Sequence, residues 1–104
     1  PLWLAPTQIA ILPVNNDAHL KHANSVVRKL EKEGLRVELD ASNEKLGYRL
    51  RTSQINKIPY TIVIGDKEQS DNLVTYRKFG AKDQITVSYR EFIAMIKREI
   101  RDKA

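Results

Sequence analysis

Apolar and polar positions along this 104-residue chain switch between the period of a strand and that of a helix. Residues 8–14 are apolar on both faces, as in a strand buried between two layers, and Pro13 stands near its end. Residues 35–39 alternate with period two, as in a second strand. Four apolar residues recur at helical spacing between these strands: Leu20, Ala23, Val27 and Leu30. The spacing predicts a β-α-β unit with parallel strands and a right-handed crossover.

Polar residues mark the ends of the predicted helices. Residues 15–17 are favourable N-cap residues, and Gly34 stands where a left-handed residue would end the first helix. A second helix is predicted over residues 44–56, because Pro59 disfavours helical backbone just before it.

Two strands are predicted after that helix, over residues 60–64 and 73–77. A break at Gly65 and a turn-rich stretch at residues 69–72 separate them. Alternate residues of the later strand share a face, with Val74 and Tyr76 toward the core and Thr75 and Arg77 away from it.

A short edge strand over residues 84–87 and a last helix complete the pattern. Residues 88–91 form a capping-box pattern before that helix. The helix buries four apolar residues: Phe92, Ile93, Ile96 and Ile100. The element order predicts an α/β fold, a three-layer α/β/α domain with a central five-stranded mixed sheet and three helices. We expect one domain over residues 1–104, with residues 1–6 as an entry linker from a longer polypeptide.

Composition narrows the class of protein. The contents of 41% hydrophobic and 30% charged residues are those of a soluble globular domain. No apolar run approaches the roughly 20 residues that span a bilayer, so no membrane partner is expected. The absence of cysteine excludes disulfides and thiolate catalysis. A net charge of +5 favours an anionic partner such as RNA.

The search for catalytic or metal sites is mostly negative. The sequence contains no glycine-rich phosphate loop. His19 and His22 lie three residues apart but have no third metal ligand at a familiar spacing, so a solvated helix face is the better interpretation. Asp66 and Glu68 are spaced as a catalytic carboxylate pair could be, but a polar turn after a buried strand explains them better. We therefore predict no catalytic residue and no metal site.

Basic residues gather around the second predicted helix. Lys45, Arg49, Arg51 and Lys57 accompany the single acid Glu44 there. At about 100° per residue, Lys45 and Arg49 share one side of the helix while Arg51 is displaced. Phosphate contacts and an ordinary solvated helix explain this pattern about equally well.

Glu68 and Arg77 offer a more specific possibility. A carboxylate accepts hydrogen bonds from N1 and N2 of guanine, and the arginine fork matches guanine O6 and N7. If the fold brings the two side chains together, they can read one unpaired guanine. The alternative is a surface salt bridge, worth about 0 to 1 kcal/mol.

Five segments resemble one known family, in order along nearly the whole chain. They are PLWLAPTQ at residues 1–8, NEKLGYRLR at 43–51, KIPY at 57–60, GDKE at 65–68 and VTYR at 74–77. They resemble the C-terminal anticodon-binding domain of bacterial-type threonyl-tRNA synthetases. Related forms of the middle segments occur in the class II synthetases for proline, glycine and histidine. One of those domains, or a small α/β domain that does not bind RNA, is therefore the alternative.

The resemblance implies that the domain binds threonine tRNA and reads the middle guanine and last uridine of its anticodon. Glu68 and Arg77 would recognise the guanine, while Asn43 and Lys45 would contact the loop at its last base. Three residues are weaker candidates for backbone phosphates: Arg49, Arg51 and Lys57. Lys67 fits either role.

The resemblance also implies what a parent enzyme would supply. A separate catalytic domain would attach threonine to tRNA with ATP, magnesium and zinc, so this chain alone would be non-catalytic and need no cofactor. The parent would be a cytoplasmic homodimer joined through its catalytic domain, without DNA as a partner.

Tyr76 stands where many relatives carry a smaller aliphatic residue, and strand alternation predicts that it packs inward.

Overall fold

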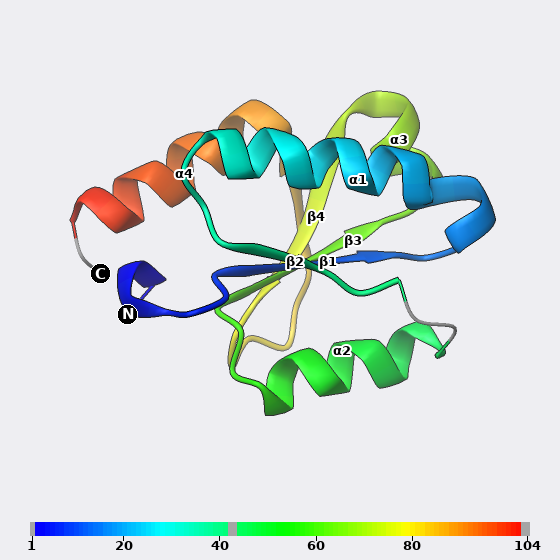
Figure 1. The fold of residues 1–104 in the computed structure, drawn as a ribbon, viewed down its shortest axis with the longest axis horizontal. Coiled ribbons are helices and arrows are strands. Elements are labelled where there is room, and N and C mark those ends of the chain that lie inside the picture. Colours follow the sequence, from blue (N-terminus) through cyan, green and yellow to red (C-terminus); the bar gives the residue numbers. More distant parts are fainter. Residues whose placement is uncertain (1, 42–43, 103–104) are drawn as a thin grey trace.

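The computed structural model describes residues 2–41 and 44–102. The elements follow in this order: η1 (Leu2–Leu4), β1 (Ile9–Pro13), α1 (Asn16–Lys32), β2 (Val37–Leu39), α2 (Leu46–Ile55), β3 (Tyr60–Ile64), α3 (Asp66–Asp71), β4 (Leu73–Lys78), β5 (Ile85–Ser88) and α4 (Tyr89–Arg101). Helices cover both faces of the sheet, with α2 on one side and α1, α3 and α4 on the opposite side (Figure 1). The α/β/α prediction is confirmed.

The central sheet has the strand order β2-β1-β3-β4-β5. β1 is parallel to β2 and to β3, whereas β4 is antiparallel to β3 and β5. Both strands of the predicted β-α-β unit are therefore parallel, and the sheet is mixed and five-stranded as expected.

Two apolar clusters hold the layers together. The larger one fills the space between the sheet and the α1 and α4 layer, and it includes the packed rings of Tyr60, Tyr76 and Phe92. Tyr76 is buried there, which confirms its inward direction. The smaller cluster places Ala10, Leu12 and Ile58 beneath α2, against the partly buried Leu46 and Leu50.

Local sequence signals set most element ends. Asn15 caps α1, because its side-chain oxygen accepts a hydrogen bond from the backbone N–H of Ala18 at 3.1 Å. Gly34 follows α1 with φ of 85°, a conformation that glycine adopts without strain. Ser88 caps α4 by accepting from the N–H of Glu91 at 3.1 Å.

The prediction of three helices was incomplete, because the structure has a fourth, α3, where a turn was expected. α3 is only six residues long and has no buried residue, so no apolar period signalled it. It starts at the Gly65 N-cap and ends at Asn72, which is left-handed with φ of 54°. Its position after β3 carries the Glu68 side chain to the end of the sheet.

The segment expected to be an entry linker packs onto the domain. Leu2 is buried in the larger cluster, and the Gln8 side-chain amide donates to the Leu2 carbonyl at 3.1 Å. The Arg36 guanidinium donates to the carbonyls of Trp3 and Ala5. Residues 2–5 are thus held by the domain itself.

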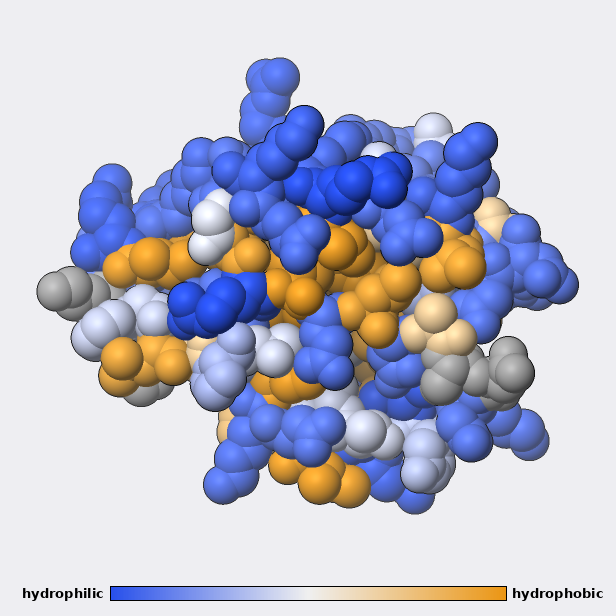
Figure 2. All heavy atoms as spheres, in the orientation of Figure 1, coloured by the Kyte–Doolittle hydropathy of each residue, from blue (hydrophilic) through white to orange (hydrophobic). Residues whose placement is uncertain are grey.

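Polar side chains cover most of the outer surface of the α1 layer (Figure 2), whereas the outer surface of α2 also exposes Ile55. Apolar side chains show in the band between the α1 layer and α2, where the edge strand β2 lies. In the described part of the chain, no helix is both long and apolar enough to cross a membrane.

Candidate nucleic-acid interface

Two rows of side chains cross the α2 side of the sheet. One row runs through Leu12, Val63, Thr75 and Thr86, and the other through Ala10, Thr61 and Arg77. α2 packs over the β1 end of these rows, and its Ser53 hydroxyl is hydrogen bonded to that of Thr61. At the other end Thr75 and Arg77 are partly exposed and Thr86 is exposed. The rows therefore emerge from beneath α2 onto an open surface of β4 and β5.

Glu68 is held at the end of this surface by two hydrogen bonds. Its Oε1 accepts from the backbone N–H of Gly65 at 2.8 Å, which closes the first turn of α3. Its Oε2 accepts from the Thr75 hydroxyl, also at 2.8 Å. These bonds fix the carboxylate on the same side of the sheet as Arg77, although Glu68 comes from a helix.

Arg77 lies two residues beyond Thr75 on the same face of β4. Successive same-face residues of a strand are about 7 Å apart, which is within the reach of an arginine side chain. Its Nε is buried and has no hydrogen-bond partner. Among residues 2–41 and 44–102 no ion pair joins Arg77 to Glu68, so the alternative of a simple salt bridge is not observed.

The other candidate contacts differ in their exposure. Lys45, Arg51, Lys57 and Lys67 are exposed. Lys45 precedes α2 and Lys67 lies in the first turn of α3, so the two lie in segments that follow β2 and β3. Asn43 lies outside the described residues.

For Arg49 the structure corrects the role predicted from the sequence. The sequence suggested a phosphate contact, but the residue is only 4% exposed. Its guanidinium donates to the carbonyls of Pro13 at 2.7 Å, Asp40 at 3.1 Å and Glu44 at 3.1 Å. Arg49 therefore ties α2 to the chain after β1 and β2 and is not presented to a ligand.

His19 also differs from the expected solvated side chain. It is 4% exposed, and its Nδ1 accepts from the Asn15 backbone N–H at 3.1 Å. In the neutral ring the proton therefore lies on Nε2, which donates to Asp66 Oδ1 at 2.6 Å. The bond joins α1 to the first turn of α3, which carries Glu68. No short sequence pattern signals it, because the partners are 47 residues apart.

The carboxylates and the second histidine show no catalytic arrangement. Asp66 is bonded to His19 and Glu68 to Gly65 and Thr75, so the two acids do not act on a shared proton. Burial, with the nearby Lys29 charge, lowers the pKa of His22. Within the described residues, no group of three metal-ligating side chains forms.

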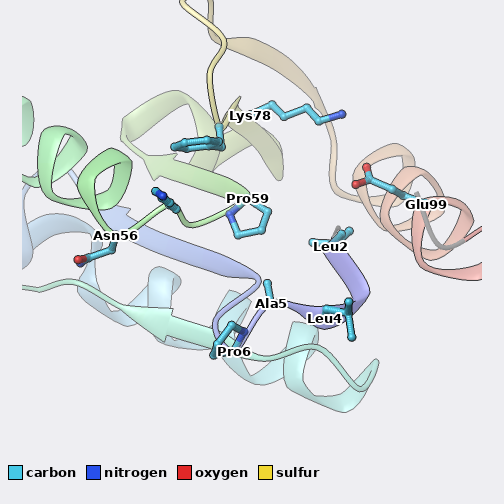
Figure 3. A pocket seen from close by; sticks show the side chains of 10 residues that line it. Leu2, Leu4, Ala5, Pro6, Asn56, Pro59, Lys78 and Glu99 are labelled. Atoms are coloured by element: carbon cyan, nitrogen blue, oxygen red, sulfur yellow. The ribbon is translucent and has the colours of Figure 1, made fainter.

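A pocket of about 580 Å³ lies at the other end of the sheet (Figure 3). Leu2, Leu4 and Pro6 line one side and Asn56 and Pro59 another, with Lys78 and Glu99 approaching from β4 and α4. Its lining includes Lys57 but neither Glu68 nor Arg77. The pocket is thus separate from the open surface of β4 and β5.

Comparison with known proteins assigns the chain to a family. Residues 8–99 match the family model described as an anticodon binding domain. The chain belongs to the anticodon-binding domain family. This match favours an anticodon-binding domain over the alternative of a small α/β domain that does not bind RNA.

The relatives of this anticodon-binding domain are threonine–tRNA ligases. The chain is 52% identical over 103 residues to the ligase of Staphylococcus carnosus and 48% identical over 101 residues to that of a Geobacillus species. These alignments cover 99% and 97% of the chain but 16% of each relative. The resemblance identified from the sequence is confirmed.

A solved structure gives the same result for the fold. The RNA-binding domain of threonyl-tRNA synthetase from Cryptosporidium parvum superposes with a TM-score of 0.88 at 29% identity. The match covers 94% of this chain and 24% of that one. The anticodon-binding domain is therefore a small part of much longer relatives.

Proposed function

We propose that this anticodon-binding domain binds threonine tRNA and that Glu68 and Arg77 read the middle guanine of the anticodon. The observation that carries the proposal is the fixed Glu68 carboxylate on the face of β4 that also presents Arg77. An anion and a cation on one face of β4 suit the edge of a base that offers both donors and acceptors.

Hydrogen-bonding capacity supports the assignment of guanine. Each oxygen of Glu68 already accepts one bond, and a carboxylate oxygen has room for a second. Guanine N1–H and N2–H would fill those positions, while Arg77 would donate to O6 and N7. Adenine reverses this pattern, because its N1 is an acceptor and its N6 a donor. The site should therefore reject adenine.

The remaining contacts are proposed from their position in the family motifs. Asn43 and Lys45 would contact the last uridine, and the exposed Arg51, Lys57 and Lys67 would approach backbone phosphates. The first anticodon base would be left unread.

The role in a whole protein is part of the same proposal. A longer chain would join this domain to a catalytic domain that esterifies threonine to tRNA in the cytoplasm, using ATP, magnesium and zinc. That enzyme would be a homodimer through its catalytic domain. The anticodon-binding domain would select the tRNA and take no part in bond formation.

Binding to short RNA tests the proposal directly. Dissociation constants are measured by fluorescence anisotropy for a threonine anticodon stem-loop and for the same RNA with adenine at the middle position. One good bidentate contact contributes about 1 to 3 kcal/mol of discrimination, so the guanine form should bind roughly 5- to 150-fold more tightly. Equal affinity for the two RNAs, or binding to neither, would contradict the proposal.

A further inference from the structure

We propose that Thr75 is a positioning residue for base reading, supported from the neighbouring strand by Thr86. The inference rests on the proposed function, because Glu68 matters only if it reads the base. Thr75 lies on the open surface two residues before Arg77 on β4, and its hydroxyl donates to the Glu68 carboxylate.

The directions of the hydrogen bonds follow from the groups involved. An ionised carboxylate only accepts, so the single proton of the Thr75 hydroxyl is donated to Glu68 Oε2 at 2.8 Å. The Thr75 oxygen is then left as an acceptor. Thr86 Oγ1 lies 2.8 Å from it and must therefore donate to Thr75. The result is a chain of bonds from Thr86 on β5 through Thr75 on β4 to Glu68 on α3.

This chain fixes the plane of the carboxylate. The Gly65 N–H holds only Oε1, and a carboxylate held at one oxygen can still turn about that contact. The Thr75 hydroxyl holds Oε2 and removes that freedom. Two donors of a base edge require both oxygens at once, so the orientation of the plane decides whether both bonds form.

The Thr75 hydroxyl holds the Glu68 carboxylate but does not hold the sheet together. Its hydroxyl satisfies no backbone group in the described structure, because its recorded partners are Glu68 and Thr86. Valine has the same shape and suits a partly exposed strand position. Replacing the hydroxyl by a methyl group should therefore leave the sheet intact while it frees the carboxylate.

The test compares variants by their discrimination ratio, the dissociation constant for the middle-adenine stem-loop divided by that for the middle-guanine stem-loop. Thr75→Val should lower this ratio about fivefold, the effect of one lost hydrogen bond, while binding of the adenine stem-loop changes less than twofold. Thr75→Ser keeps the hydroxyl and should retain the ratio. Thr86→Val should lower it by about twofold, because Thr86 acts only through Thr75.

Thr52→Val is the matched control, since the Thr52 hydroxyl bonds the Tyr48 carbonyl within α2 and should not affect the ratio. A Thr75→Val domain with the native ratio, or with equally weakened binding of both RNAs, would overturn the inference. If the Thr75→Val domain does not fold, an unchanged discrimination ratio in the Thr86→Val domain would also overturn the inference. Absence of discrimination in the unsubstituted domain would instead refute the proposed function.

Discussion

Arg49 and Arg51 carry the same side chain two residues apart on α2 but lie in different environments. The first is buried and its guanidinium donates to four backbone carbonyls, whereas the second is exposed. The structure therefore separates an arginine that holds the fold from one that is available to RNA.

This difference predicts unequal effects on stability. Arg49→Ala removes the guanidinium that donates to the carbonyls of Pro13, Asp40 and Glu44, and it should lower the free energy of unfolding by about 2 to 4 kcal/mol. Arg51→Ala, the control, should change it by less than about 0.5 kcal/mol. Urea unfolding followed by circular dichroism measures both. Equal effects would contradict the structural role of Arg49.

The environment of Tyr60 predicts how the free energy of unfolding changes with pH in the alkaline range. Burial, together with its hydrogen bond to Glu99, raises the pKa of Tyr60. The unfolded chain ionises this tyrosine near pH 10, whereas the folded domain resists ionisation. The stabilising contribution is therefore complete below about pH 10 and is lost as pH rises above it.

Tyr60→Phe should flatten the fall in unfolding free energy between about pH 10 and 11.5, because phenylalanine has no proton to lose. Tyr48→Phe, the same substitution at a side chain that is 56% exposed, is the control. Denaturation midpoints across that range provide the measurement. Identical profiles for the two variants would refute the assignment.

The sequence predicts the direction of a side chain where the local period of the strand or helix determines it. Strand alternation correctly placed Tyr76 in the core and Arg77 on the opposite face, because the period of two is rigid. The burial of Arg49 and of His19 was missed. Both depend on acceptors contributed by distant segments, and helical spacing alone does not reveal them.

At the scale of elements, the predictable parts were those with a clear period or cap. All five strands and the three longer helices were anticipated to within a few residues. α3 was not, because none of its six residues is apolar or buried. Its bonds to α1 through His19 and to β4 through Glu68 join it to segments distant in the sequence, and no local pattern signals them.

Alanine substitutions at two glycines test the backbone conformation after α1 and within α2. Gly34 has φ of 85°, so Gly34→Ala should destabilise the domain by roughly 1 kcal/mol. Gly47 lies inside α2 with nothing within 4 Å of an added Cβ, so Gly47→Ala should stabilise it by about 0.5 kcal/mol. Thermal unfolding of the two variants gives the signs. Shifts in the same direction would contradict these assignments.

At the scale of the whole molecule, the net charge of +5 predicts RNA binding that weakens with salt. Exposed lysines should contribute to affinity without selecting a base, because phosphates carry no sequence information. Base selection and electrostatic attraction should therefore be separable by mutation.

Lys57→Ala tests this separation. It should weaken binding of the guanine and adenine stem-loops equally, and it should lower the slope of log Kd against log salt concentration by about 1 for one lost phosphate contact. Anisotropy titrations between 50 and 200 mM salt, about the range over which such slopes are resolved, provide the values. A change confined to one stem-loop would contradict a phosphate role for Lys57.

The central claim is that Glu68 reads the middle base together with Arg77. The most direct test is the discrimination ratio of the middle-guanine and middle-adenine stem-loops for the Glu68→Gln domain. This variant keeps the shape of the side chain but replaces an acceptor by a donor facing guanine. We predict that the preference for guanine, roughly 5- to 150-fold in the unsubstituted domain, disappears while the domain remains folded. A Glu68→Gln domain that keeps the full native preference would contradict the account.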